Sequence, residues 1–203
     1  MGQLTPEQMR RVADLSELYG DGEVRLTVWQ SLLLTGLAET HLPTVEKALR
    51  DLGFGVESSN ATSGIIACTG SRFCKYAQSD TKAHAVQLSE HLARRLELDQ
   101  PVNIHFTGCP HSCAQHAMGD IGLLGTRVKR GDASVDGYHV FVGGGFGKNQ
   151  ALGRQVFTGV AHDAVPSLLE KMLRAYLLHR QGSEAFQSFT TRFEVGRLQE
   201  LFS

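Results

Sequence analysis

Apolar and polar positions at the start of the chain follow the 3.6-residue spacing of an amphipathic helix. Thr5 is a favourable N-cap, Pro6 fits the first helical position, and Gln8 stands where a capping box needs a glutamine. The pattern continues to about Tyr19, and Gly20 is a natural stop. These positions predict a helix that begins just after Thr5.

The spacing then changes to the alternation of a strand. Between Glu23 and Leu34, the apolar residues Val24, Leu26 and Val28 alternate with polar ones. The pattern predicts one strand that buries these three side chains, with Arg25 on its solvated face.

A second amphipathic pattern runs from Leu42 to Leu52 and ends at Gly53, which predicts another helix. Residues 54–57 are consistent with a short returning strand. We therefore expect residues 1–57 to form a small α/β unit of their own.

From residue 58 onward, loops rich in glycine and cysteine separate periodic segments. The pattern predicts helices over 79–96 and 165–180, strands over 102–106, 121–129 and 138–142, and a short phenylalanine-rich segment that closes the chain. Helices alternating with strands indicate layered α/β architecture. We expect residues 58–203 to form a second, larger domain.

Composition excludes several classes of protein. The 203 residues are 41% hydrophobic, and 20 Lys and Arg residues balance 21 Asp and Glu residues. Disordered chains and general nucleic-acid binders depart from such values, so neither class fits. No apolar run approaches the roughly 18 residues of a membrane span, and the first residues do not resemble a secretory signal. A cytoplasmic, reducing setting is expected, in which cysteines are more often ligands or catalytic groups than disulfides.

All four cysteines fall into two clusters, Cys68 with Cys74 and Cys109 with Cys113, each after an apolar strand-like run. Two disulfides, a structural zinc site and an iron–sulfur cluster are the three possible interpretations. Zinc ligands are usually paired across about two to four residues, whereas five residues separate Cys68 from Cys74. Longer and unequal spacers suit a cluster, and Gly70 and Gly108 would let backbone amides approach its sulfides. The pattern favours the iron–sulfur interpretation.

Other patterns offer weaker chemistry. The stretch Gly143–Lys148 fits neither the dinucleotide-binding fingerprint nor the P-loop, and it predicts a tight turn near the cluster. His84 and His91 lie on one helix face without a metal-binding pattern, and we expect both at the surface or at the boundary of the core. His111 lies inside the second cysteine motif, where a cofactor contact and a spacer role are equally consistent with the sequence.

The two cysteine motifs carry a family resemblance. Cys-Thr-Gly-x-x-Phe-Cys-Lys, then Asp80-Thr81-Lys82, and then Thr-Gly-Cys-Pro-His-Ser-Cys-Ala-Gln with Gly119-Asp120-Ile121-Gly122 resemble the sirohaem-dependent nitrite and sulfite reductases. The similarity extends through Val142–Gly145 into the last long helix. The first 55 residues resemble one copy of that family's ferredoxin-like repeat, in which Arg-x-Thr-x-x-Gln recurs.

The resemblance implies specific cofactors and ligands. It implies a 4Fe–4S cluster on Cys68, Cys74, Cys109 and Cys113, with Cys113 also bridging to the iron of sirohaem. It implies further sirohaem contacts from residues that match the repeat motif or lie within the second cysteine motif, namely Arg25, Thr27, Gln30 and His111.

The resemblance also implies a reaction, the six-electron reduction of nitrite to ammonium, with ferredoxin as the expected donor. Cys-Thr-Gly-x-x-Phe-Cys is similar to the nitrite branch, although some sulfite-reducing members share it. Family members are about twice as long, so the chain resembles a C-terminal half that acts with an N-terminal half or partner subunit. No catalytic residue of the distal anion pocket can be assigned by motif, and a non-catalytic electron-relay subunit is the alternative.

Overall fold

The computed structural model describes residues 2–57 and 59–203. The chain divides into two compact units, Met1–Ser58 and Ser59–Ser203, and each is described by itself. Residue 58, at which the sequence predicts the change of domain, lies outside the described residues.

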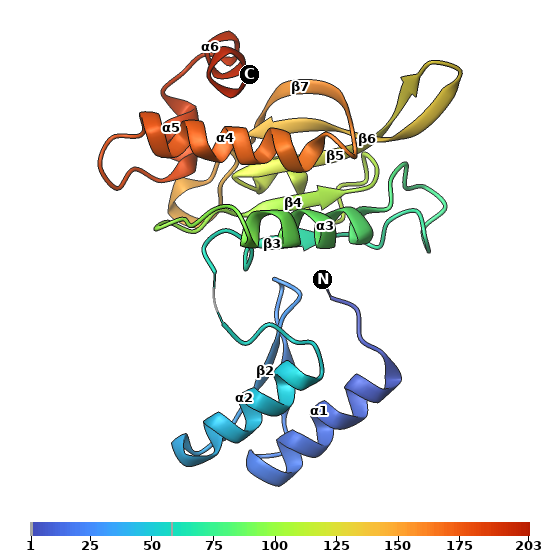
Figure 1. Ribbon diagram of the computed structural model, residues 1–203, viewed down its shortest axis with the longest axis vertical. Coiled ribbons are helices and arrows are strands. Elements are labelled where there is room, and N and C mark those ends of the chain that lie inside the picture. Colours follow the sequence, from blue (N-terminus) through green and yellow to red (C-terminus); the bar gives the residue numbers. More distant parts are fainter. Residues whose placement is uncertain (1, 58) are drawn as a thin grey trace. The chain divides into compact units, whose positions relative to one another are not determined.

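The first unit is a two-stranded antiparallel sheet with two α-helices (Figure 1). The predicted capping box of the first helix is confirmed: the Gln8 amide donates to Thr5 Oγ1 at 3.1 Å, and the Thr5 amide donates to Gln8 Oε1 at 2.9 Å. The buried apolar side chains of this unit include Val12, Leu15 and Val45. The elements are α1 (Pro6–Tyr19), β1 (Val24–Leu26), β2 (Leu32–Leu34), the 3-10 helix η1 (Glu39–His41) and α2 (Leu42–Asp51).

The prediction of one strand over residues 23–34 is wrong, because the chain reverses in the middle of it. The Gln30 amide donates to the Thr27 carbonyl oxygen at 3.1 Å, and Gln30 has a left-handed φ of 60°. The predicted buried face is also wrong, since Leu26 is 81% exposed. Residues 54–57 form no strand. The Arg-x-Thr-x-x-Gln motif therefore runs from β1 through the turn of a β-hairpin.

Replacing Thr5 with alanine is expected to destabilise the first unit by about 1 kcal/mol, because the Gln8 amide at the start of α1 loses the Thr5 hydroxyl oxygen that accepts its hydrogen bond. Urea unfolding followed by the fluorescence of Trp29, the single tryptophan, reports on this unit. Thr44→Ala, at an exposed position of α2, is the control and should change stability by no more than about 0.5 kcal/mol. Equal effects of the two substitutions would contradict a capping role for Thr5.

The second unit is built on a five-stranded sheet in the order β3-β4-β5-β6-β7 (Figure 1). The strands β3, β4 and β5 are parallel, and β6 and β7 continue the sheet antiparallel. The last strand was not predicted, and the hairpin of β5 and β6 is longer than expected. The bounds are β3 (Ile65–Ala67), β4 (Ile104–Thr107), β5 (Ile121–Arg130), β6 (Ala133–Val142) and β7 (Arg154–Ala161).

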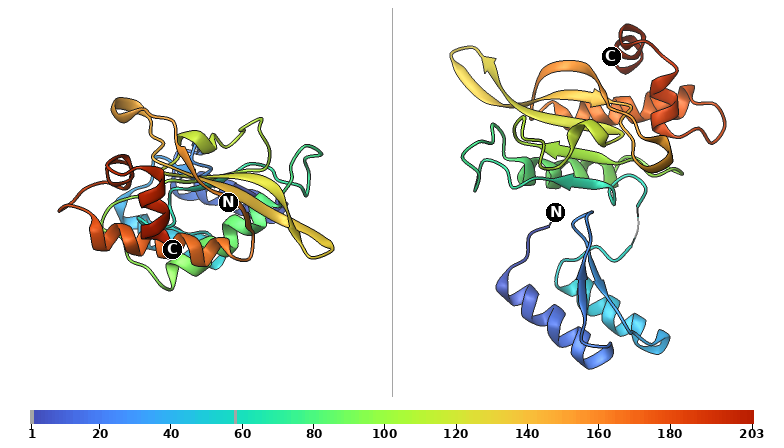
Figure 2. Two further views of the ribbon diagram at one scale, coloured as in Figure 1. Left: turned by 90° about the horizontal axis from the view of Figure 1, so that it is seen from above. Right: turned by 180° about the vertical axis from the view of Figure 1, so that it is seen from behind.

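Helices α3 (Thr81–Ala93) and α4 (Val165–His179) lie side by side on one face of this sheet (Figures 1 and 2). The chain ends in two short helices, α5 (Phe186–Thr191) and α6 (Val195–Phe202), in place of the single segment expected. Aromatic side chains fill the core, and the largest of those that are fully buried are Phe106, Tyr138, Tyr176, Phe186, Phe189 and Phe202. No helix among the described residues is long and apolar enough to cross a membrane.

Candidate metal centre

Both cysteine motifs begin at the carboxyl ends of neighbouring parallel strands. Cys68 directly follows β3, and Cys109 lies two residues after β4. Ala67 pairs with Phe106 in the register of these strands, and the Cys68 amide donates to the Phe106 carbonyl oxygen at 2.9 Å. Because parallel strands end at the same edge of a sheet, the two motifs start next to each other.

The first cysteine loop, residues 68–80, is closed by its own backbone. The Cys74 amide donates to the Gly70 carbonyl oxygen at 3.0 Å, and the Ser71 amide donates to the Ser79 carbonyl oxygen at 3.0 Å. The loop is also tied to β6, where the Ser79 hydroxyl donates to the Gly137 carbonyl oxygen at 2.9 Å. It then passes into α3, with Asp80 as N-cap. The shape of the loop is therefore fixed by hydrogen bonds within the chain.

Gly108 connects the two loops. Its amide donates to Cys68 Sγ at 3.2 Å, and its carbonyl oxygen accepts from the Gln78 amide at 2.7 Å. A Cβ atom at this position would lie 2.7 Å from the Cβ of Ala77, so only glycine fits without a shift. A hydrogen bond from a backbone amide stabilises the negative charge of a thiolate. It also tunes the redox potential of the metal that the thiolate binds.

The second cysteine loop, residues 108–120, is the crossover from β4 to β5. Three consecutive turns build it, closed by amide-to-carbonyl bonds from Ser112 to Cys109, from Gln115 to Ser112 and from Met118 to Gln115. The last turn is the 3-10 helix η2 (His116–Met118). Cys109 is buried whereas Cys113 is exposed, so the loop presents one thiol to the interior and one to the outside.

Cationic groups lie near the first loop. Lys82, in the first turn of α3, has a pKa lowered by partial burial, an effect that the nearby Cys68 opposes. The ammonium of Lys75 lies 5.1 Å from the centre of the Tyr76 ring. Phe73 and Tyr76 are 73% and 55% exposed, so the solvent-exposed surface of this loop is aromatic and cationic.

All four cysteines are free thiols in the structure, so nothing supports the disulfide interpretation. Among residues 2–57 and 59–203, no three His, Cys, Asp or Glu side chains are grouped as one metal ion requires. The choice between zinc and a cluster therefore rests on the ligand spacing and on the surroundings of the thiols. Four thiols on two adjoining loops, with an amide already aimed at one sulfur, fit the wider ligand set of an iron–sulfur cluster.

The residues predicted to contact sirohaem lie in two places. Arg25 is exposed in β1 and pairs with Glu23 at 2.8 Å, and Thr27 and Gln30 form the turn of the same hairpin. His111 lies inside the second motif, with its Nδ1 3.4 Å from Cys109 Sγ. The first three thus share one hairpin of the first unit, and their sirohaem role stays a prediction.

His84 and His91 lie at the boundary of the core, as expected, and both have side-chain partners. His84 is half-buried, its Nδ1 lies 2.7 Å from the hydroxyl oxygen of Tyr138, and its ring stacks on His162. His91 is also half-buried, and its Nε2 lies 2.7 Å from a carboxylate oxygen of Glu170 in α4. Sequence spacing missed both contacts because the partners lie far away in the chain.

The glycine-rich stretch Gly143–Lys148 leaves β6 in a turn, as expected. Gly143 has a left-handed φ of 84°, and a Cβ atom at Gly144 would lie 2.4 Å from the Gly119 carbonyl oxygen. The stretch therefore packs closely against the end of the second cysteine loop.

Two residues that contact the cysteine loops had not been assigned a role. The Thr81 hydroxyl donates to the Cys68 carbonyl oxygen at 2.8 Å and lies 3.6 Å from Cys68 Sγ. His105, buried in β4, lies with its Nδ1 3.1 Å from the Gln115 carbonyl oxygen. A signal for His105 was available, since a histidine inside the apolar run before Thr-Gly-Cys needs a buried partner.

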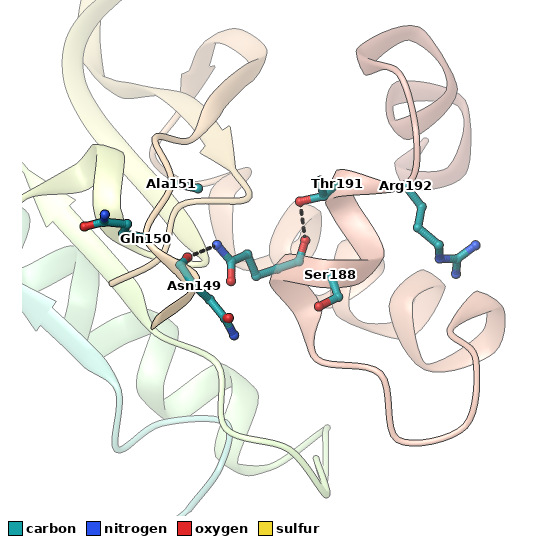
Figure 3. A pocket seen from close by; sticks show the side chains of 7 residues that line it. Asn149, Gln150, Ala151, Ser188, Thr191 and Arg192 are labelled. Carbon is teal, nitrogen blue, oxygen red and sulfur yellow. Dashed lines mark hydrogen bonds between the residues drawn. The ribbon is translucent and has the colours of Figure 1, made fainter. Parts of the chain in front are cut away.

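A hollow of about 510 Å³ lies between the end of the glycine-rich stretch and α5 (Figure 3). Amide, hydroxyl and guanidinium groups line it, and Gln187 Nε2 donates across it to the Asn149 carbonyl oxygen at 2.6 Å. Arg192 is held by Glu184 at 2.7 Å. None of the residues predicted from the sequence lines this hollow. The lining residues are Asn149, Gln150, Ala151, Gln187, Ser188, Thr191 and Arg192.

Family profiles match both parts of the chain. The profile described as "Nitrite and sulphite reductase 4Fe-4S domain" matches residues 58–193, and "Nitrite/Sulfite reductase ferredoxin-like half domain" matches residues 1–52. These matches support an iron–sulfur cluster and confirm the mixed α/β fold with a ferredoxin-like half domain.

Known relatives agree with the profiles. A ferredoxin–nitrite reductase of Synechococcus elongatus is 38% identical over 91% of this chain and 35% of its own. Sulfite reductase (ferredoxin) 1 of Mycolicibacterium paratuberculosis is 31% identical over 98% of this chain and 37% of its own. The chain thus spans about a third of the length of these curated relatives, so the expectation that family members are about twice as long is too low.

Solved structures show the same fold. The NirA protein of Mycobacterium tuberculosis superposes with a TM-score of 0.87 at 31% identity, over 93% of this chain and 36% of that one. Dissimilatory sulfite reductase I superposes with a TM-score of 0.82 at 14% identity, a likeness of fold alone. From its profile matches, its relatives and its fold, the chain belongs to the nitrite and sulfite reductase family.

Proposed function

We propose that the chain is the cofactor-carrying part of a nitrite reductase, with a 4Fe–4S cluster held by Cys68, Cys74, Cys109 and Cys113. In this proposal residues 1–57 are the ferredoxin-like half-repeat and residues 58–203 are the cluster domain. The observation that carries it is the junction of the two cysteine loops, where the Gly108 amide donates to Cys68 Sγ at 3.2 Å. Such a bond to a ligand sulfur stabilises the charge of a thiolate-bound cluster.

The residues around the loops have distinct tasks in this proposal. Gly108 donates to the ligand sulfur, Thr81 fixes the Cys68 backbone, and Lys82 places a positive charge on the same side. A thiol binds metal in its deprotonated form, and these groups surround the sulfur that would do so. A cluster of this kind accepts and passes on single electrons when bound.

Cys113 is proposed to bind the sirohaem iron as well. It is the exposed thiol of the set, so its sulfur can reach a second group outside the loop. Arg25, Thr27, Gln30 and His111 are proposed to hold the peripheral carboxylates of the macrocycle, since guanidinium, hydroxyl, amide and imidazole groups all donate to carboxylates.

Nitrite is the proposed substrate, and ferredoxin is the proposed donor. The ferredoxin–nitrite reductase of Synechococcus elongatus is 38% identical, against 31% for the mycobacterial sulfite reductase. Phe73, Lys75 and Tyr76 give the first cysteine loop an aromatic and cationic surface. An electron-donor protein with an acidic surface could dock there by charge complementarity. Sulfite reduction by the same site is the second candidate, favoured by the mycobacterial relative that covers 98% of the chain.

A non-catalytic relay is a third candidate, because the chain spans about a third of the relatives' length. In that case the chain would pass electrons and depend on a partner half to bind the anion.

Reconstitution with iron, sulfide and sirohaem, followed by turnover with a chemical reductant, separates these functions. Nitrite consumption with stoichiometric ammonium supports the first proposal, and faster sulfite consumption replaces it with the second. A loaded protein that turns over neither anion until an N-terminal half is added is a relay. A protein that binds no sirohaem contradicts the role of Cys113.

A further inference from the structure

Cys113 lies between two residues with strained backbones. Ser112 has a φ of 56° and Gln115 a φ of 54°, and both occupy the left-handed region that favours glycine. Each stands where one turn of the second cysteine loop ends and the next begins. Serine and glutamine adopt this conformation at a cost in free energy, which surrounding contacts must offset.

One such contact comes from inside the sheet. His105 is only 2% exposed in β4, and its Nδ1 lies 3.1 Å from the Gln115 carbonyl oxygen. A carbonyl oxygen only accepts hydrogen bonds, so Nδ1 of this imidazole carries the proton and donates. The buried ring thereby holds Gln115, one of the two strained residues, from the side of the sheet.

The other contact comes from the end of the loop. His116 Nδ1 lies 2.9 Å from the Ser112 hydroxyl oxygen, and its ring packs edge-on against Phe141 at 5.1 Å. The backbone of His116 is seated on β5, because a Cβ atom at Gly122 would lie 1.9 Å from its carbonyl oxygen. His116 is thus fixed to the sheet and holds the second strained residue.

We propose that His105 and His116 are positioning residues that hold Ser112 and Gln115 in their left-handed conformations and so aim the Cys113 thiol. This inference rests on the proposed function only for the identity of the group that Cys113 binds. The loop geometry concerns this chain's own residues and can be measured without a cofactor.

Two substitutions of His105 form a matched pair. The side-chain nitrogen of asparagine is as many bonds from Cα as Nδ1, so His105→Asn keeps a donor at the position that meets Gln115. The nitrogen of glutamine corresponds to Nε2, so His105→Gln keeps an amide but moves the donor away. His116→Asn and His116→Gln repeat the comparison for the bond to Ser112. Circular dichroism and thermal unfolding select the variants that fold.

Hydrogen exchange of the full chain without metal is the first readout. The amides of residues 112–116 should exchange about 10-fold faster in His105→Gln than in the wild type, with β5 unchanged and His105→Asn close to the wild type. Equal exchange of these amides in the wild type and His105→Gln would overturn the positioning role.

Iron retention after reconstitution is the second readout. Under a chelator, His105→Gln should retain iron roughly 10- to 100-fold more weakly, as expected for a group that orients a ligand. The electron paramagnetic resonance signal of the reduced cluster should also shift in this variant and recover in His105→Asn. An identical signal and retention in His105→Gln would overturn the proposal. A wild-type chain that binds no cluster contradicts the proposed function instead, and the exchange comparison still decides the positioning role.

Discussion

Replacing Cys113 with serine is expected to abolish electronic coupling between cluster and sirohaem and to lower nitrite turnover by at least about 100-fold. That figure is the upper end of the loss caused by removing an outer partner of a metal ligand, and Cys113 is proposed as the ligand itself. A serine oxygen is a harder donor than a thiolate and binds iron–sulfur clusters poorly. Visible and electron paramagnetic resonance spectra of the reconstituted variant measure the coupling.

Ser71→Ala is the control for this substitution. It also changes one atom of an exposed side chain in a cysteine loop, and it leaves all four thiols in place. The control should keep the wild-type spectra. An unchanged haem spectrum in Cys113→Ser would refute the assignment of this residue as the bridge.

Replacing Gly122 with alanine is expected to destabilise the second unit by about 3 kcal/mol, the upper end of the cost of overpacking. The added Cβ would lie 1.9 Å from the His116 carbonyl oxygen and 2.7 Å from the His116 carbonyl carbon. The backbone of η2 or of β5 must therefore move. Gly122 is also the neighbour of His105 in the register of β4 and β5. We expect the melting temperature to fall by roughly 6–12 °C and the second cysteine loop to shift.

Gly196→Ala is the matched control, since a Cβ atom there meets nothing within 4 Å. Because Gly196 lies in α6, alanine should stabilise that helix slightly. Thermal unfolding followed by circular dichroism compares the two variants. Similar melting temperatures for Gly122→Ala and the wild type would contradict the close seating of η2 on β5.

Much of the fold followed from local patterns. The cap at Thr5 and the helix over 165–180 were predictable because capping chemistry and helical periodicity involve neighbouring residues. The reversal between Thr27 and Gln30 was not, because it depends on a left-handed glutamine, which propensities disfavour. Strand β7 escaped prediction because its apolar residues stand in adjacent pairs and do not alternate with polar ones, and its place is set by pairing with β6.

The site was predictable where covalent chemistry marks it and unpredictable where packing builds it. The cysteine spacing and the flanking glycines pointed to the two loops and to an amide near a sulfur, and Gly108 provides one. The sequence indicated that His105 needs a buried partner, but the partners of His105, Thr81 and His116 could not be identified. Each contact joins residues whose proximity depends on the register of β4 and β5 or on the start of α3.

Four thiols on two adjoining loops are proposed to hold one 4Fe–4S cluster. The iron, acid-labile sulfide and zinc content of the reconstituted full chain, measured with its visible spectrum, decides whether they do. We expect about four iron and four sulfide per chain, a broad thiolate-to-iron absorption, and loss of the bound iron and of this absorption in Cys68→Ser. One zinc per chain without sulfide, or iron binding that survives Cys68→Ser unchanged, would contradict this proposal.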